Sequence, residues 1–132
     1  LKGLSVMANY TYTNSNADAQ FRKNLRLPGQ ADHTANGSLA FSHKKFTIQG
    51  NLNYNGAYTV LLGDQDATDV IRNKRVQIDA NSSYRLTDKI SLYIEAQNLT
   101  KAPQIDYFGE RSRIYQNQFY SFWGRAGVKI RF

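Results

Sequence analysis

Three aspartates, Asp64, Asp66 and Asp69, have a spacing at which carboxylates could coordinate a calcium ion. A calcium loop of the EF-hand type also needs a glycine that allows the chain to turn and a glutamate at its distal end. Neither residue stands at the required position. We therefore predict that these aspartates lie in a solvated polar loop and bind no metal ion.

The sequence also offers few residues that could form a catalytic site. The sequence has two histidines, His33 and His43, and no cysteine. Neither histidine pairs with a serine and a carboxylate that would complete a hydrolase triad, and the chain has no glycine-rich phosphate loop. The sequence therefore predicts neither an enzyme nor a protein that holds a cofactor.

Two carboxylates and one arginine are candidates for a polar network. If a turn at residues 87–89 pairs the segments on either side, Glu95 lies opposite Asn81 and diagonal to Asp79. Arg125 on the next segment could neutralise both carboxylates. We interpret Asp79, Glu95 and Arg125 as lumen-facing residues in a structural pairing rather than a ligand site, because charges on a lumen wall need compensation whatever the cargo.

These residues belong to segments in which apolar or small residues alternate with polar ones. A β-strand places alternate side chains on opposite faces, so each segment has one apolar and one polar face. No Lys, Arg, Asp or Glu falls on an apolar face, and several positions there are Gly, Ala or Ser, which suits lipid better than a tightly packed soluble core. The six segments are residues 4–13, 33–42, 46–55, 76–86, 90–97 and 120–132.

The connections between the segments alternate between long and short. Three long polar stretches, residues 14–32, 56–75 and 100–118, would lie at one end of an up-and-down sheet, with two tight turns at the other. Aromatic residues of the apolar faces gather near both ends, as at the two interfaces of a membrane. Long extracellular loops and short periplasmic turns are typical of bacterial outer-membrane barrels. We predict an all-β, antiparallel, up-and-down transmembrane β-barrel segment in the bacterial outer membrane.

Composition agrees with this class. The 132 residues contain no linker, which predicts one domain over residues 1–132. The mean hydropathy is -0.58, and no stretch approaches the roughly 18 apolar residues of a membrane-spanning helix. The net charge of +7 comes from scattered Lys and Arg, which argues against nucleic-acid binding.

No cleavable signal opens the chain, so we expect either that one has been removed or that the sequence begins within a longer protein.

Several stretches together resemble the carboxy-terminal part of the barrel of TonB-dependent outer-membrane receptors. No single stretch is specific, but their order and spacing along essentially the whole chain are. They are Ala-Asn-Tyr-Thr-Tyr at residues 8–12, Leu-Pro-Gly-Gln at 27–30, His-Thr-Ala-Asn at 33–36, Tyr-Arg-Leu-Thr-Asp-Lys-Ile at 84–90, Glu-Ala-Gln-Asn-Leu-Thr at 95–100, Tyr-Phe-Gly at 107–109 and Val-Lys-Ile-Arg-Phe at 128–132.

The resemblance implies a barrel of about 22 strands with an amino-terminal plug. Such receptors import a scarce nutrient, such as a siderophore, cobalamin, a glycan or a peptide, with energy relayed by TonB. This chain has six predicted strands and neither plug nor TonB-box, so we expect it to be the carboxy-terminal portion of a longer receptor. The implied partners are outer-membrane lipid, the plug and remaining strands, TonB and the barrel-assembly machinery; a surface lipoprotein is a further candidate.

The resemblance also implies roles for particular residues. A terminal strand that ends in Phe132, with Ile130 and Val128 upstream, would carry the signal that the barrel-assembly machinery reads. Aromatic residues of the long loops are candidate ligand contacts. These are Tyr58, Tyr107, Phe108 and Tyr115.

Two other classes of protein remain open at this point. A passive porin or structural outer-membrane barrel would use the same wall. A soluble β-barrel binding protein would show a similar alternation.

Overall fold

The computed structural model describes residues 3–19 and 22–132, so Leu1, Lys2 and two residues of the first predicted loop, Gln20 and Phe21, lie outside it. The described chain is all-β apart from a 3-10 turn, η1 (Asp66–Thr68). The predicted fold class is thereby confirmed. The strands are β1 (Leu4–Tyr12), β2 (Ala17–Ala19), β3 (Arg22–Leu25), β4 (His33–His43), β5 (Phe46–Asn55), β6 (Tyr58–Leu61), β7 (Val70–Arg72), β8 (Arg75–Arg85), β9 (Ile90–Gln97), β10 (Gln104–Phe108), β11 (Ile114–Gln118) and β12 (Trp123–Ile130).

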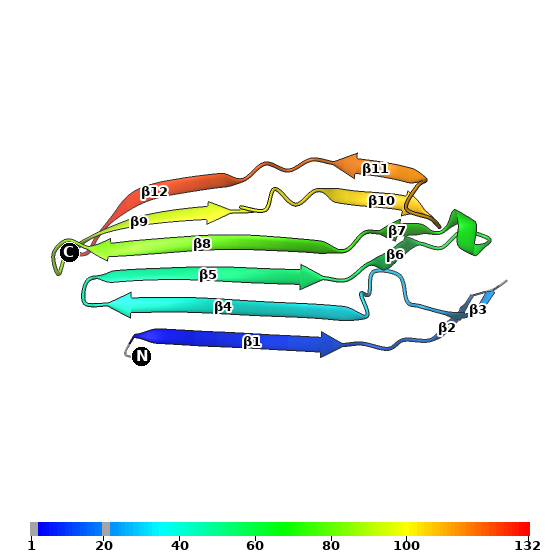
Figure 1. The fold of residues 1–132 in the computed structure, drawn as a ribbon, viewed down its shortest axis with the longest axis horizontal. Coiled ribbons are helices and arrows are strands. Elements are labelled where there is room, and N and C mark those ends of the chain that lie inside the picture. Colours follow the sequence, from blue (N-terminus) through cyan, green and yellow to red (C-terminus); the bar gives the residue numbers. More distant parts are fainter. Residues whose placement is uncertain (1–2, 20–21) are drawn as a thin grey trace.

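One large antiparallel sheet, here called the wall sheet, follows the six predicted segments closely. Within the described residues its strand order is β1-β4-β5-β8-β9-β12, so the long strands pair in the order in which the chain reaches them. Figure 1 shows them side by side, with the start of β1 and the end of β12 at the end that carries the short turns. β12 is shorter than predicted and begins at Trp123. The carbonyls of Tyr120 and Ser121 accept hydrogen bonds from the Asn98 side chain instead.

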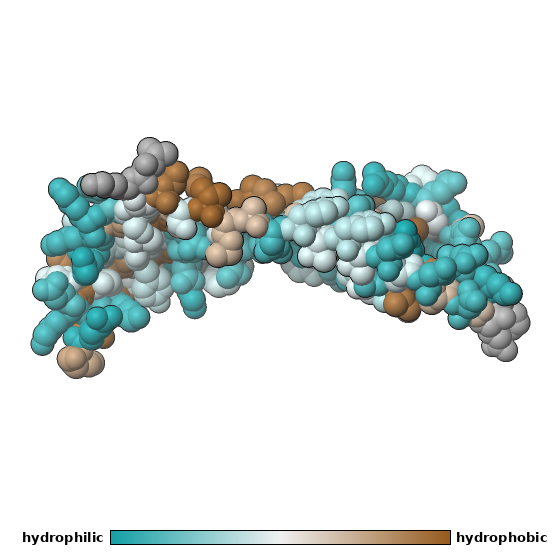
Figure 2. Space-filling model, turned by 90° about the horizontal axis from the view of Figure 1, so that it is seen from below, coloured by the Kyte–Doolittle hydropathy of each residue, from teal (hydrophilic) through white to brown (hydrophobic). Residues whose placement is uncertain are grey.

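The register keeps the two faces of the wall sheet separate across its strands. Directly paired residues share a face, so one row joins Tyr10, Ala35, Tyr54 and Val76, and the next row joins Asn9, Asn36, Asn53 and Gln77. Side chains of the apolar face are open to the surroundings: Val6 is 70% exposed and Ile94 is 58% exposed. In the edge-on view of Figure 2, hydrophobic residues gather on one side of this sheet, between hydrophilic residues at its ends.

The three long stretches contain more structure than the predicted loops. β6, β7, β10 and β11 form a second antiparallel sheet, here called the distal sheet, in the order β11-β10-β7-β6. Figure 1 shows it continuing from the long-connection end of the wall sheet. These strands have three to five residues each, and an alternation that short cannot be separated from an irregular loop.

Buried residues lie around the junction of the two sheets and in the distal sheet. The buried hydrophobic residues of the described chain are Ala31, Val70, Ala102 and Tyr107, and no large side chain there is fully buried. Neither face of the wall sheet is therefore buried, and this sheet has no core of its own. No helix in the described ranges is long and apolar enough to cross a membrane.

Candidate functional site

Asn98 directs the chain from the wall sheet to the distal sheet. It follows β9 with a φ of 55° and is 6% exposed. Its backbone N–H donates to Asp79 Oδ1 (2.8 Å), and its side-chain Oδ1 accepts from the N–H of Ala102 (2.9 Å). Its Nδ2 donates to the carbonyls of Tyr120 and Ser121. The Asn98 side chain thus joins the segment that leads into β10 to the segment that leads into β12, while the Asn98 backbone N–H bonds to β8.

The predicted polar network is divided into two parts. Glu95 lies opposite Asn81, as expected, and directly opposite Arg125 on its other side. The Nε of Arg125 lies 2.7 Å from Glu95 Oε2. Asp79 takes no part in this pair, and the β8–β9 pairing ends at Ala80, the residue that follows Asp79. Its carboxylate instead accepts from the backbone of Asn98 and from Gln77 Nε2 (3.0 Å).

A polar cavity of about 420 Å³ lies where the wall sheet meets the distal sheet. Its lining combines arginines and side-chain amides from the polar face of the wall sheet with residues of β6, β7 and β10. No carboxylate lines it among the described residues. Its lining residues include Asn53, Asn55, Tyr58, Arg72, Arg75, Gln77 and Gln104.

Arg72 builds one side of this cavity. Its direct partner across β7 and β10 is Asp106, which is 3% exposed. Nε and Nη2 of Arg72 each lie 2.9 Å from one oxygen of that carboxylate, a bidentate pair. The Nη1 of Arg72 also lies 3.2 Å from the Tyr58 hydroxyl, and its guanidinium lies over the Tyr58 ring. The hydrogen bond with Asp106 raises the pKa of Arg72 above its ordinary value, although burial opposes the shift.

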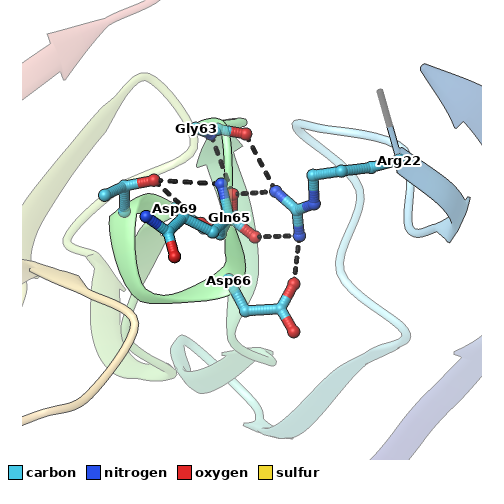
Figure 3. Close-up of polar contacts among 6 residues, drawn as sticks. Arg22, Gly63, Gln65, Asp66 and Asp69 are labelled. Carbon is cyan, nitrogen blue, oxygen red and sulfur yellow. Dashed lines mark hydrogen bonds and ion pairs between the residues drawn. The ribbon is translucent and has the colours of Figure 1, made fainter. Parts of the chain in front are cut away.

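A second arginine, Arg22, joins two of the long stretches, and we call this contact the latch (Figure 3). Arg22 begins β3, and its Nη1 lies 2.6 Å from Asp69 Oδ1 and 3.0 Å from the carbonyl oxygen of Gly63. Its Nη2 bonds both Asp66 and Asp69. Asp69 is therefore shielded and ion-paired, whereas the Asp66 side chain is 96% exposed and stays in solvent, as predicted for this stretch.

The latch also fixes the charge of Asp69. Burial of this carboxyl opposes ionisation, but hydrogen bonds from Arg22 and from the backbone N–H of Gly63 outweigh burial and lower the pKa of Asp69 below its ordinary 3.8. A lowered pKa means that ionised Asp69 stabilises the latch above that value and that this contribution is lost as the pH falls through the lowered pKa. The cation that neutralises Asp69 is an arginine. In the parts of the chain that the structure describes, no three acidic or histidine side chains are placed to hold a metal.

The predicted ligand-contact aromatics lie on strands rather than in loops. Tyr58 lines the polar cavity. Tyr107 is 7% exposed within the distal sheet, which takes it out of reach of a surface ligand. Phe108 and Tyr115 stack edge to face with ring centroids 4.9 Å apart, and neither residue lines the cavity.

The histidines and the terminal strand have simpler surroundings. His33 Nδ1 lies 2.7 Å from the Tyr10 hydroxyl, and the ring of His43 stacks on Phe41. Val128 and Ile130 lie on the exposed apolar face of β12, and Phe132 beyond it is fully exposed.

Sequence reasoning missed Arg22, Arg72 and Asp106 as members of the site. Arg72 and Asp106 meet only through the pairing of β7 with β10, and Arg22 reaches Asp69 from 47 residues away. No local spacing indicates either contact.

The model of the family described as TonB dependent receptor-like, beta-barrel, matches residues 2–99 of the chain. No curated protein and no solved structure matches the chain. The chain belongs to this family of TonB-dependent receptor barrels. The family comprises outer-membrane receptors and transporters rather than enzymes, and it characteristically occurs in the outer membrane of Gram-negative bacteria, with a plug domain, TonB and lipid as its general surroundings.

We predict that Arg22→Gln opens the latch locally. The substitution removes the charge that holds Asp69, and a hydrogen bond to a charged group contributes about 1.5–3 kcal/mol, so the N–H of Gly63 should exchange about tenfold to hundredfold faster. Hydrogen–deuterium exchange of the intact receptor measures this at residues 63–69. Lys23→Gln, at the next and exposed position, is the matched control, and equal exchange in the two variants would contradict the latch.

Proposed function

We propose that the chain forms the carboxy-terminal wall of a TonB-dependent receptor that imports a scarce nutrient, such as a siderophore, cobalamin, a glycan or a peptide. The observation that carries the proposal is the wall sheet, whose apolar face is open along its strands while its polar face leads to a cavity of amides and arginines. The family match supports the same class. A soluble binding protein fits less well, because Val6, Ile94 and Val128 would be left in water.

The open edges of the wall sheet support the proposal that residues 1–132 are one portion of a longer barrel. In the described chain, β1 and β12 each pair on one side only. An unpaired backbone group in hydrocarbon costs several kcal/mol, so these edges need partner strands in the membrane. In this proposal the remaining strands of the same polypeptide, to a total of about 22, close the barrel.

The ends of the wall sheet suggest its orientation. Short turns are typical of the periplasmic end and long connections of the extracellular end. The distal sheet, the latch and the polar cavity would then lie at the extracellular mouth, where a ligand enters. The plug would lie against the polar face, TonB would engage the amino-terminal part, and a surface lipoprotein could cover the mouth.

The test separates active import from a passive pore without knowledge of the substrate. We expect the intact receptor to bind the soluble carboxy-terminal domain of TonB and to give no steady conductance in a planar bilayer, because a plug fills its lumen. Open channels without TonB binding would instead identify a passive porin. A structural barrel would show neither TonB binding nor open channels.

We also propose that Phe132, with Ile130 and Val128, is read by the barrel-assembly machinery. Phe132 is fully exposed, so its loss should leave the stability of the folded wall unchanged. We expect Phe132→Ser to remove most of the receptor from the outer membrane, as measured by heat-modifiable gel mobility of membrane fractions. Arg131→Ser is the control, and equal assembly of both variants would argue against a role for the terminal aromatic residue.

A further inference from the structure

Arg75 is a charged residue of the polar cavity that has no counter-ion among the residues that the structure describes. It begins β8 and lines the cavity together with Asn55, its direct partner on β5. Its Nε is shielded from solvent and has no hydrogen-bond partner in the described structure. Over residues 3–19 and 22–132, no carboxylate lies within ion-pair distance of Arg75, in contrast to Arg22, Arg72 and Arg125.

One aromatic contact restrains the side chain of Arg75. Its guanidinium carbon lies 5.5 Å from the centroid of the Tyr120 ring, a cation–π contact. The carbonyl of Tyr120 is held in turn by the side chain of Asn98. A charge held in place in this way loses little conformational freedom when it binds a partner.

The rest of the lining determines which partner fits. The positive charge of Arg72 is neutralised by buried Asp106, so among the described residues that line the cavity the uncompensated charge is that of Arg75. Around it stand neutral amides that donate and accept hydrogen bonds, and no acidic residue of the described chain lines the cavity. The amide residues are Asn36, Asn53, Asn55, Asn73, Gln77 and Gln104.

We infer that this cavity binds the oxyanion, a carboxylate or a phosphate, of a small hydroxyl-bearing ligand, with Arg75 as its counter-charge. An arginine is suited to this role because its planar fork matches both anions. The amides then bond the hydroxyl groups of the ligand. The inference rests on the proposed function, because it places this subsite on the route of the imported ligand.

Three probes and two variants test the inference by isothermal titration calorimetry on the intact receptor in detergent. The probes are glucose 6-phosphate, gluconate and neutral glucose, which share hydroxyl groups and differ in charge. We expect one or both anions to bind more tightly than glucose, and Arg75→Gln to weaken the anion about tenfold or more while glucose is unaffected. Arg85→Gln is the matched control, because Arg85 ends the same strand on the same face, outside the cavity.

Several outcomes would overturn the inference. These are equal binding of anions and glucose, equal effects of Arg75→Gln and Arg85→Gln, or no binding of either anion at millimolar concentration. If Arg75 instead pairs with an acidic residue of the plug, Arg75→Gln lowers the melting temperature of the ligand-free receptor and leaves probe affinities unchanged. The binding measurements do not depend on TonB. If the protein were a passive barrel whose cavity still bound anions through Arg75, the proposed function would be wrong and the inference about the cavity would stand.

Discussion

The whole arrangement depends on the backbone hydrogen bonds of the wall sheet, because in hydrocarbon every N–H and C=O must find a partner in a neighbouring strand. That requirement fixes long strands in continuous register, and continuous register in turn keeps the apolar residues on one face and the amides on the other. The exposed apolar face is then the lipid-facing side of a wall. Within the described chain, β1 and β12 each have one side without a partner strand, and there the same requirement is not met.

At the long-connection end, where the backbone pairing of the wall sheet stops, side-chain hydrogen bonds and ion pairs hold the segments together. Asn98 satisfies the carbonyls of Tyr120 and Ser121 at the point where β12 has not yet begun. Beyond it, two arginines hold the short distal elements together, Arg72 through Asp106 and Arg22 through Asp69. Short strands bury little apolar surface, so these charge-assisted bonds supply much of the order that positions the cavity. Arg75 differs from them because its partner is absent from the described chain.

The sequence predicted most of the wall and little of the site, for physical reasons. Ten or eleven residues of strict alternation, as in β5 and β8, are enough to define a strand, its faces and even the pairing of Glu95 with Asn81. Three residues, as in β7, are not. Contacts such as that between Arg22 and Asp69 arise from how distant segments come together, which no local pattern encodes. Asp79 lies just beyond the point where the pairing of β8 with β9 ends, at Ala80, and the alternation of apolar and polar residues does not mark that point.

The central claim, that one face of the wall sheet meets lipid and the other meets water, is tested most directly by spin labels placed one at a time along β5 in the intact receptor in bilayers. Labels at Ile48, Gly50 and Leu52 should collide mainly with oxygen, which concentrates in lipid. Labels at Gln49, Asn51 and Asn53 should report a polar surrounding, so the oxygen accessibility should alternate with a period of two residues. An accessibility that does not alternate, or that alternates in the opposite phase, would contradict the account.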